Sequence, residues 1–420
     1  MTSPHRPDDF LHDLRARSAA EGGVFWINDG LLAVFEPEAA RHVSRTNWQG
    51  FVMPERGLDL LRRRPSPEVA WTRVRTAWLT QLHHLSTAER RDRLTARMRA
   101  VMDARLGRRI DLVTLSQDVT VRSLLPVALA GLTPRESVWV ERDLDQKLRR
   151  LIDRAPGTGP GHRLHFAAVQ VRAGRVVRRV LRARASGRRP RERDLADPFV
   201  DLLPELGMDR ALSVVTTVLT AIGGPPGSAA AAVLYEFARR PRWAALLAAE
   251  HQGTDEADFL AAPAGAAPLT HRFVQETLRM WSPPLLLVRR ARGTYDLGAA
   301  TLRAGQEYIL SPHMIHRDRR YWNEPDTFDP DRFLPGAPHG PAGRGSYVPF
   351  GWAPKRCVGA DLGTVQLMAL CRLLCTRYRL TVPDADQVAM AFRFAPVPQD
   401  FHGTLALRRH VARDGTGHGG

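Results

Sequence analysis

The chain has 420 residues, 44% of them hydrophobic, so it is long enough to bury a large core. Its formal net charge is +17, but the excess comes from arginines spread along the chain without a recognition helix or an aromatic stacking motif, which argues against nucleic-acid binding. The first 30 residues hold no apolar targeting segment, no run of 18 apolar residues occurs, and three cysteines are too few for a disulfide framework. We therefore expect a cytoplasmic protein without a membrane segment.

The spacing of apolar residues predicts a mainly α-helical protein with small β-sheets. Helical spacing occurs at about 66–84, 112–130, 163–186, 207–240, 242–251, 268–281 and 360–377. Capping boxes at 86–89 (Ser-Thr-Ala-Glu) and 133–136 (Thr-Pro-Arg-Glu) open further amphipathic stretches. Stretches near 285–309 and 378–408 favour strands. Because no linker or repeat divides 30–410, we expect a single domain over 1–420, with frayed ends at 1–6 and 411–420.

The most apolar helical segment runs from Leu212 to Arg240 and is expected to be one long buried helix. Pro225 and Pro226 remove two amide donors inside it and clash with the preceding turn. The sequence therefore predicts a bulge or kink at this point.

Cys357 stands immediately before the predicted helix at 360–377, and Lys355 and Arg356 precede it. A helix N-terminus and nearby cations favour the thiolate form of a cysteine, so we expect a lowered pKa and a ligand for a soft metal. The alternative is a buried cysteine that only caps the helix.

The segment Phe350-Gly351-Trp352-Ala353-Pro354-Lys355-Arg356-Cys357-Val358-Gly359 resembles the haem-ligand loop of the cytochrome P450 family, written F-G-x-G-x-[HR]-x-C-x-G. The resemblance implies the cytochrome P450 fold, a triangular prism with the haem between a long distal helix and the proximal helix that follows the cysteine. The implied cofactor is haem b with Cys357 as the axial thiolate. Phe350, Gly351, Lys355 and Gly359 would contact the haem.

Further motifs of the family follow in the same order along the chain. Trp71 and Arg75 resemble W-x-x-x-R, whose arginine binds a haem propionate, and Arg289 matches another position on the propionate side. The pair Glu276/Arg279 resembles E-x-x-R. Arg332 lies in a segment similar to P-E-R-F, and a glutamate that bridges two arginines would lock the loop leading to the cysteine. The plain alternative for Glu276/Arg279 is a solvated surface pair.

The chain departs from the family on the distal side. Relatives commonly carry A-G-x-[DE]-T, whose acid and alcohol relay protons to dioxygen at the haem. Here the matching stretch is Ala221-Ile222-Gly223-Gly224-Pro225, so Gly224 replaces the acid and Pro225 replaces the alcohol. Losing a positioned proton donor costs about 10²–10⁴ in rate.

This departure motivates the hypothesis of non-standard chemistry on an apolar secondary metabolite. A pre-activated substrate with a weak O–O or N–O bond would undergo oxene-type or nitrene-type group transfer, or oxidative cyclisation, without the usual proton relay. One alternative is a conventional monooxygenase that needs O2, NAD(P)H and a ferredoxin with its reductase, which a basic face would attract. Another is a catalytically silent relative that acts as a partner protein. We also expect a monomer.

The resemblance places several segments around the distal pocket. The expected apolar wall consists of Trp48, Phe51, Thr217, Ala221, Leu285, Leu286, Leu287 and Phe401. Each of these residues could equally be ordinary core. Arg290, Asp400 and His402 are candidate polar anchors.

Overall fold

A computed structural model describes residues 7–47, 50–51, 69–152, 160–337, 340–341 and 345–408. Its α-helices are α1 (Pro7–Glu21), α2 (Pro37–Thr46), α4 (Trp71–Leu85), α5 (Ala88–Asp103), α6 (Leu112–Ala128), α7 (Pro134–Ile152), α8 (Pro160–Ala185), α9 (Pro198–Asp201), α10 (Leu203–Ile222), α11 (Pro225–Arg239), α12 (Pro241–Gly253), α13 (Glu256–Ala261), α14 (Pro263–Ala266), α15 (Pro268–Met280), α16 (Pro312–His316) and α17 (Ala360–Thr376). Short 3₁₀ helices are η1 (Pro330–Phe333) and η2 (Ala385–Gln387). Many helices begin at a proline, whose fixed φ and missing N–H suit the first helical position.

The strands are short and form small sheets. They are β1 (Val24–Asn28), β2 (Leu31–Val34), β3 (Gly50–Phe51), β4 (Val69–Ala70), β5 (Arg109–Asp111), β6 (Leu287–Arg290), β7 (Tyr295–Asp296), β8 (Thr301–Leu302), β9 (Glu307–Leu310), β10 (Tyr378–Thr381), β11 (Met390–Phe392), β12 (Pro396–Pro398) and β13 (His402–Leu407). The largest sheet has the order β1-β2-β9-β6, with β2 and β9 parallel and the other pairs antiparallel. A three-stranded sheet has the order β10-β13-β5.

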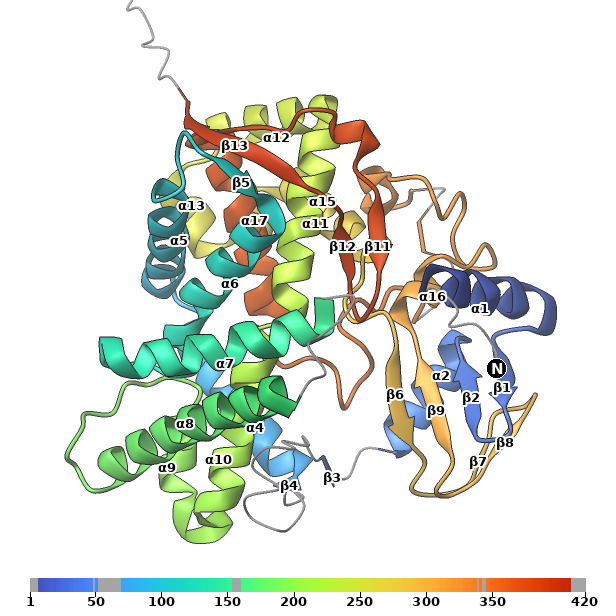
Figure 1. The fold of residues 1–420 in the computed structure, drawn as a ribbon. Coiled ribbons are helices and arrows are strands. Elements are labelled where there is room, and N and C mark those ends of the chain that lie inside the picture. Colours follow the sequence, from blue (N-terminus) through green and yellow to red (C-terminus); the bar gives the residue numbers. More distant parts are fainter. Residues whose placement is uncertain are drawn as a thin grey trace, which may run out of the picture.

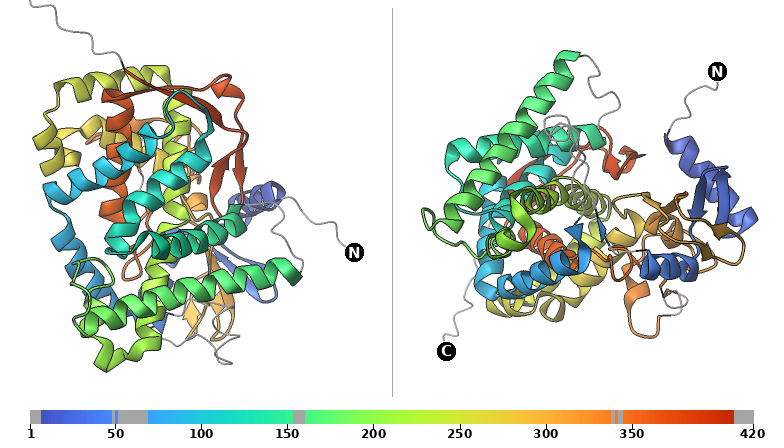
Figure 2. Two further views of the ribbon diagram at one scale, coloured as in Figure 1. Left: turned by 60° about the vertical axis from the view of Figure 1, so that its left-hand side comes forward. Right: turned by 90° about the horizontal axis from the view of Figure 1, so that it is seen from below.

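Helices and the largest sheet occupy different parts of the molecule. Figure 1 shows α4 to α13, α15 and α17 gathered on one side, and α1, α2 and the sheet β1-β2-β9-β6 on the other. The same separation is visible from below in Figure 2. The mainly helical class with small sheets, expected from the sequence, is confirmed.

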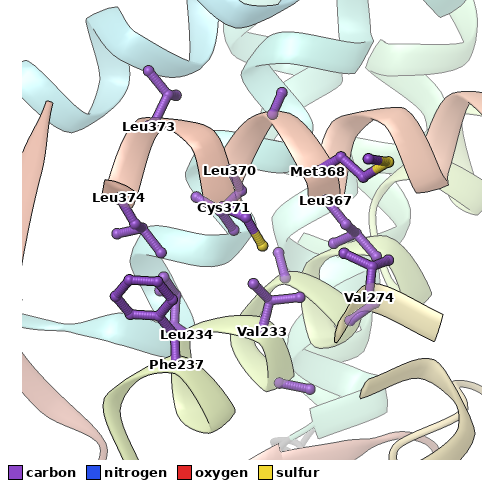
Figure 3. Packing of buried hydrophobic residues seen from close by; sticks show 14 of the residues in the cluster. Val233, Leu234, Phe237, Val274, Leu367, Met368, Leu370, Cys371, Leu373 and Leu374 are labelled. Atoms are coloured by element: carbon purple, nitrogen blue, oxygen red, sulfur yellow. The ribbon is translucent and has the colours of Figure 1, made fainter. Parts of the chain in front are cut away.

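The centre of the helical part is α17, which is buried along most of its length. Figure 3 shows its apolar side chains, among them Leu367, Leu370 and Leu374, facing Val233 and Phe237 of α11. Cys371 packs within this cluster and is fully buried, as expected for a small core residue. Because α17 begins at Ala360, this packing fixes the position of Cys357 three residues earlier.

The predicted single helix over 212–240 is two helices. α10 ends at Ile222, α11 begins at Pro225, and Gly224 between them has φ −127° and ψ −88°, which are not helical values. Neither Pro225 nor Pro226 has an N–H to continue the hydrogen bonding of α10. The expected distortion is therefore a complete break.

Other boundaries show what the sequence predicted well. The Thr133 capping box forms, since the amide of Thr133 donates to Glu136 Oε2 at 3.0 Å and the amide of Glu136 to Thr133 Oγ1 at 3.3 Å. At the other box, the N-cap is Thr87. The helix expected at 66–84 begins only at Trp71 in the described part of the chain.

Within the described residues, one stretch is long and apolar enough to cross a membrane by length and composition. It spans Leu203–Arg239, and 72% of its most apolar window is buried inside the protein. The core helix of a soluble protein passes the same test, so this is weak evidence for a membrane span.

Candidate active site

The cysteine loop is held in shape by backbone hydrogen bonds. The amide of Cys357 donates to the carbonyl of Phe350 at 2.9 Å, and the amide of Gly351 donates to the carbonyl of Val348 at 3.0 Å. Gly351 has φ +73°, a left-handed value that strongly favours glycine. The loop therefore presents the Cys357 sulfur at the N-terminal end of α17.

The electrostatic balance at Cys357 differs from the expectation. Its side chain is exposed, because it opens into a cavity, but the surrounding protein still raises the pKa of the thiol by burial. The amide of Gly359 and the cations Arg356 and Arg75 act in the opposite direction without prevailing. The prediction of a lowered pKa in the protein alone was wrong. A coordinated metal cation would deprotonate the thiol outright.

Helix α4 holds the cysteine loop from one side. The indole N–H of Trp71 donates to the carbonyl of Pro354 at 3.2 Å, and Arg75 Nη1 donates to the carbonyl of Arg356 at 2.7 Å. The resemblance had assigned these two residues to the haem. The structure shows that both also bind the backbone of the cysteine loop.

Glu276, Arg279 and Arg332 form a buried ionic triad. Glu276 accepts from Arg279 Nε at 2.7 Å and from Arg332 Nε at 3.2 Å, and the three side chains are almost fully inaccessible to solvent. Arg279 Nη1 also donates to the carbonyls of His316 and Pro325, both at 2.8 Å. The triad therefore joins α15 to the segment that leads to the cysteine loop, and the surface-pair alternative does not hold.

His316 makes a second connection to this loop that the sequence reasoning missed. Its Nε2 accepts the amide N–H of Val348 at 2.8 Å, and its Nδ1 lies 2.8 Å from Ser282 Oγ. Because Ser282 Oγ donates to the carbonyl of Leu278, the serine accepts from His316, which fixes a neutral tautomer protonated on Nδ1. Burial lowers the pKa of His316 well below its usual value, in agreement with this tautomer.

A cavity with about 1270 Å³ of empty space, part of it open to solvent, lies beside the cysteine loop. The predicted residues that line it are Ala221, Pro225, Leu287, Arg289, Phe350, Gly351, Lys355, Cys357 and Gly359. Residues that the sequence reasoning did not single out also line it; they include Ser44, Tyr308 and Gln366. None of these three residues lies in a motif that the sequence analysis used, so no sequence signal could have found them.

Several predicted pocket residues lie elsewhere. Phe401 is fully buried against Tyr235, and Leu285 packs in a separate core cluster together with Leu286. Thr217 donates its hydroxyl to the carbonyl of Ser213 and is not among the described lining residues. These four residues therefore belong to the core and not to the cavity wall. The sequence reasoning placed them at the pocket because position in the chain does not tell which face of an element meets the cavity. Trp48 and the side chain of Phe51 lie outside the described residues.

One corner of the cavity is suited to an acidic group. Arg289 is half-buried, desolvation lowers its pKa, and it pairs with no carboxylate in the described part of the chain, its Nη1 donating only to the carbonyl of Val288 at 3.0 Å. Tyr308 and Asn47, which share a hydrogen bond of 2.8 Å, line the same cavity. A half-buried cation without a counter-ion favours an anion beside it, so a carboxylate of a bound group would fit here.

The wall formed by the broken helix is apolar. Ala221, Pro225, Pro226 and Ala229 line the cavity from α10 and α11. No aspartate or glutamate lies among the described residues of the lining. Gly224, which the sequence analysis expects at the position of the family's acid, is the N-cap of α11 and has no side chain to carry a proton.

One cavity thus holds a cysteine sulfur, an apolar wall and a half-buried cation, a set that fits an iron porphyrin with carboxylate side chains. The fold and the site thus define a haem-thiolate protein. A family model for cytochrome P450 matches residues 151–399, more than half of the chain, and this chain belongs to the cytochrome P450 family. The expected cofactor, haem b with a cysteine thiolate ligand, follows from this membership.

Curated relatives are similar over limited stretches. Cyclooctatin synthase from Streptomyces melanosporofaciens is 34% identical over 111 residues, which are 26% of this chain and 24% of that protein. Pentalenene oxygenase from Streptomyces avermitilis is 30% identical over 131 residues, 30% of this chain and 29% of that protein. Human steroid 17-alpha-hydroxylase/17,20 lyase is 32% identical over 122 residues, 27% of this chain and 23% of that protein. The matches thus span only about a quarter of each relative's length.

Solved structures match the whole fold. A zebrafish cytochrome P450 structure with progesterone has a TM-score of 0.77 at 16% identity, and the match covers 94% of this chain and 99% of the other. The haem domain of a cytochrome P450DA mutant has a TM-score of 0.74 at 19% identity and covers 96% and 94%. These similarities confirm the predicted fold.

Proposed function

We propose that this protein tailors an apolar secondary metabolite by group transfer or oxidative cyclisation of a substrate that is already activated. The observation that supports this most strongly is the distal wall. Gly224 and Pro225 stand at the break between α10 and α11, and the described lining residues include no carboxylate. A proton relay built from an acid and an alcohol therefore has no side chain at these positions.

Cys357 would hold the haem iron, and Arg289 with Tyr308 and Asn47 would hold a haem carboxylate. When bound, the haem supplies a redox-active iron whose reactivity the thiolate increases. Pro225, Pro226 and Leu287 would orient an apolar substrate by contact and exclude water from it.

The proposed reaction balances without an external reductant. The weak O–O or N–O bond of the substrate breaks, the transferred oxygen or nitrogen forms a new bond to carbon, and an alcohol or a carboxylic acid leaves. The hydrogen of the C–H bond that is replaced ends on the transferred oxygen or nitrogen or on the leaving group. The names of the Streptomyces relatives, which refer to cyclooctatin and pentalenene, support a small-molecule scaffold as substrate.

A second candidate is a conventional monooxygenase supplied by a ferredoxin and its reductase, a reading that the name of pentalenene oxygenase supports. One surface observation also favours it. Arg90, Arg93 and Arg97 of α5 lie beside Asp361 and Leu362, at the start of the helix that follows the cysteine loop. An acidic electron carrier would complement these charges. In both cases we propose a cytoplasmic, monomeric, single-domain protein.

The two candidates are separated by what the reaction needs. Haem-loaded protein is incubated with an apolar test compound plus either an alkyl hydroperoxide or an O-acyl hydroxylamine, without NAD(P)H or protein partners. A parallel incubation contains O2, NADPH, ferredoxin and ferredoxin reductase. Product in the first incubation, absent from Cys357→Ala, supports group transfer. Product only in the second would reject it in favour of the monooxygenase.

A further inference from the structure

A polar face on α7 lies next to the end of α10. It consists of Asp143, Gln146 and Lys147. Gln146 and Lys147 are three and four residues after Asp143, so both lie on the same side of the helix as Asp143. Lys147 Nζ lies 2.9 Å from Asp143 Oδ2 and donates to Thr220 Oγ1 at 3.0 Å. We call these three residues the α7 polar face.

Two oxygen atoms of this face lack hydrogen bonds. Asp143 Oδ1 and Gln146 Oε1 are buried, and neither has a partner in the described part of the chain. Asp143 itself is only 5% exposed. Leaving a buried acceptor unpaired costs about 1–3 kcal/mol, so two neighbouring ones need an explanation. A ligand that donates hydrogen bonds would supply it.

The cation at this position is also unusual for the chain. Only two of the 61 basic residues are lysines, Lys147 and Lys355, and Lys355 lines the haem cavity. A compact ammonium group fits between one carboxylate and one hydroxyl, whereas the planar guanidinium of arginine is larger and rigid. Thr220 is fixed to receive it, because its hydroxyl donates to the carbonyl of Thr216 at 2.9 Å.

The face packs against the end of α10, the helix that carries part of the distal wall, although its three residues are not among those described as lining the cavity. Thr220 directly precedes Ala221, which lines the cavity, and Leu144 of α7 lies 3.2 Å from the position that a Cβ would take at Gly223. Figure 1 shows α7 crossing the helical part near the junction of α10 and α11. A substrate that fills the cavity toward this junction would approach the α7 polar face.

We propose that the α7 polar face recognises an uncharged hydrogen-bond donor of the substrate, a hydroxyl or an amide N–H. Asp143 and Gln146 provide the acceptors. Because Lys147 neutralises the charge of Asp143, a charged group on the ligand would gain little binding energy from electrostatic attraction. The substrate then has an apolar body for the wall of Pro225 and Pro226 and a donor group at one end. This inference rests on the proposed function only in that the substrate occupies the distal cavity.

The test uses binding and no turnover, so it is independent of which oxidant the enzyme needs. Haem-loaded protein is titrated with 1-alkylimidazoles of increasing chain length that end in a methyl, a hydroxyl or a carboxylate, and Kd is read from the haem absorption spectrum. At the chain length that reaches α7, the hydroxyl probe is expected to bind about tenfold more tightly than the methyl probe, as one added hydrogen bond gives. The carboxylate probe is expected to bind more weakly than both.

The variant Asp143→Leu/Lys147→Met removes the ion pair without leaving an unpaired charge, a change that folded proteins tolerate well. It is expected to lower the preference for the hydroxyl probe at least threefold, because Gln146 remains as the one acceptor. The matched control Glu89→Gln/Arg93→Gln removes an exposed i,i+4 pair from α5 and should keep the tenfold preference. If the double variant loads too little haem, Gln146→Leu replaces it and is expected to lower the preference at least threefold.

Two results would overturn the proposal. One is equal binding of the hydroxyl and methyl probes to the unmodified protein at every chain length. The other is a variant of the α7 polar face whose Tm falls while the ranking of the probes stays the same, because a purely structural pair would behave in that way.

Discussion

The side-chain amide of Gln117 on α6 lies against the backbone of Gly227 on α11, so closely that a Cβ at position 227 would sit 1.9 Å from Gln117 Oε1. Both residues are buried, and α6 and α11 pack along each other. Glycine at 227 therefore sets how closely these two helices approach beside the distal wall.

Gly227→Ala is expected to destabilise the protein by about 1–3 kcal/mol, since the methyl group has no space. Chemical unfolding followed by circular dichroism measures this. In Gln117→Ala/Gly227→Ala the methyl group has room, so a double-mutant cycle should show a coupling of about 1 kcal/mol or more. The control Gly253→Ala, with no atom within 4 Å of its added Cβ, should change stability little. Additive effects of the two substitutions would contradict the packing described.

The buried triad makes Arg332 important for stability. Arg332→Met leaves Glu276 with one arginine in a site without solvent, so we expect a loss of about 3–5 kcal/mol and a low yield of haem-loaded protein. The same substitution at Arg17, whose partner Glu21 is exposed, should cost less than about 1 kcal/mol. Similar unfolding free energies for the two variants would show that the triad does not anchor the cysteine loop.

Arg289 is expected to hold a haem carboxylate. In Arg289→Met the protein should fold normally, because no carboxylate of the described residues pairs with this arginine, but haem should dissociate roughly ten to a hundred times faster, as the loss of a charged hydrogen bond implies. Transfer of haem to an excess of an apo-globin measures the rate. Arg290→Met, an exposed neighbour paired with Glu307, is the control and should lose haem at the original rate. If Arg289→Met retains haem equally well, the acidic corner of the cavity is assigned incorrectly.

Stability is expected to fall in mild acid. Burial, with a smaller effect from Arg372, lowers the pKa of His251 to about 4, and its ring lies between Thr270 and Arg372. The unfolded chain binds this proton near pH 6.5, so the stabilisation is complete above pH 6.5 and is lost as the pH falls toward 4. The loss from this residue amounts to about 3 kcal/mol. His316, whose pKa is also lowered by burial, adds to it in the same direction.

Urea unfolding at pH 7.5, 6.5, 5.5 and 4.5 tests this. His251→Gln should be less stable than the original protein at pH 7.5 but should lose less on acidification. Parallel pH profiles for the two proteins would mean that His251 does not titrate in this window.

The parts of the site closest in sequence were predictable. Residues 350–359 form one loop, and Glu276 and Arg279 are a single helical turn apart, so their contacts follow from local geometry. The same holds for the interruption at Pro225, which follows from the absence of two amide donors. The assignments failed where a face had to be chosen: Phe401 and Leu285 have the right composition for a pocket but pack into core clusters.

By itself, the sequence determined the helical class, the cysteine at the start of α17 and the presence of Gly224 and Pro225, without acid or alcohol, at the helix break. These are local properties, set by periodicity, backbone chemistry and residue identity within a few positions. Only the tertiary structure decided that His316 holds Val348, that Gln117 faces Gly227 and that Lys147 joins Asp143 to Thr220. Such contacts depend on how helices far apart in the chain are rotated against each other, which is settled by the packing of the whole core.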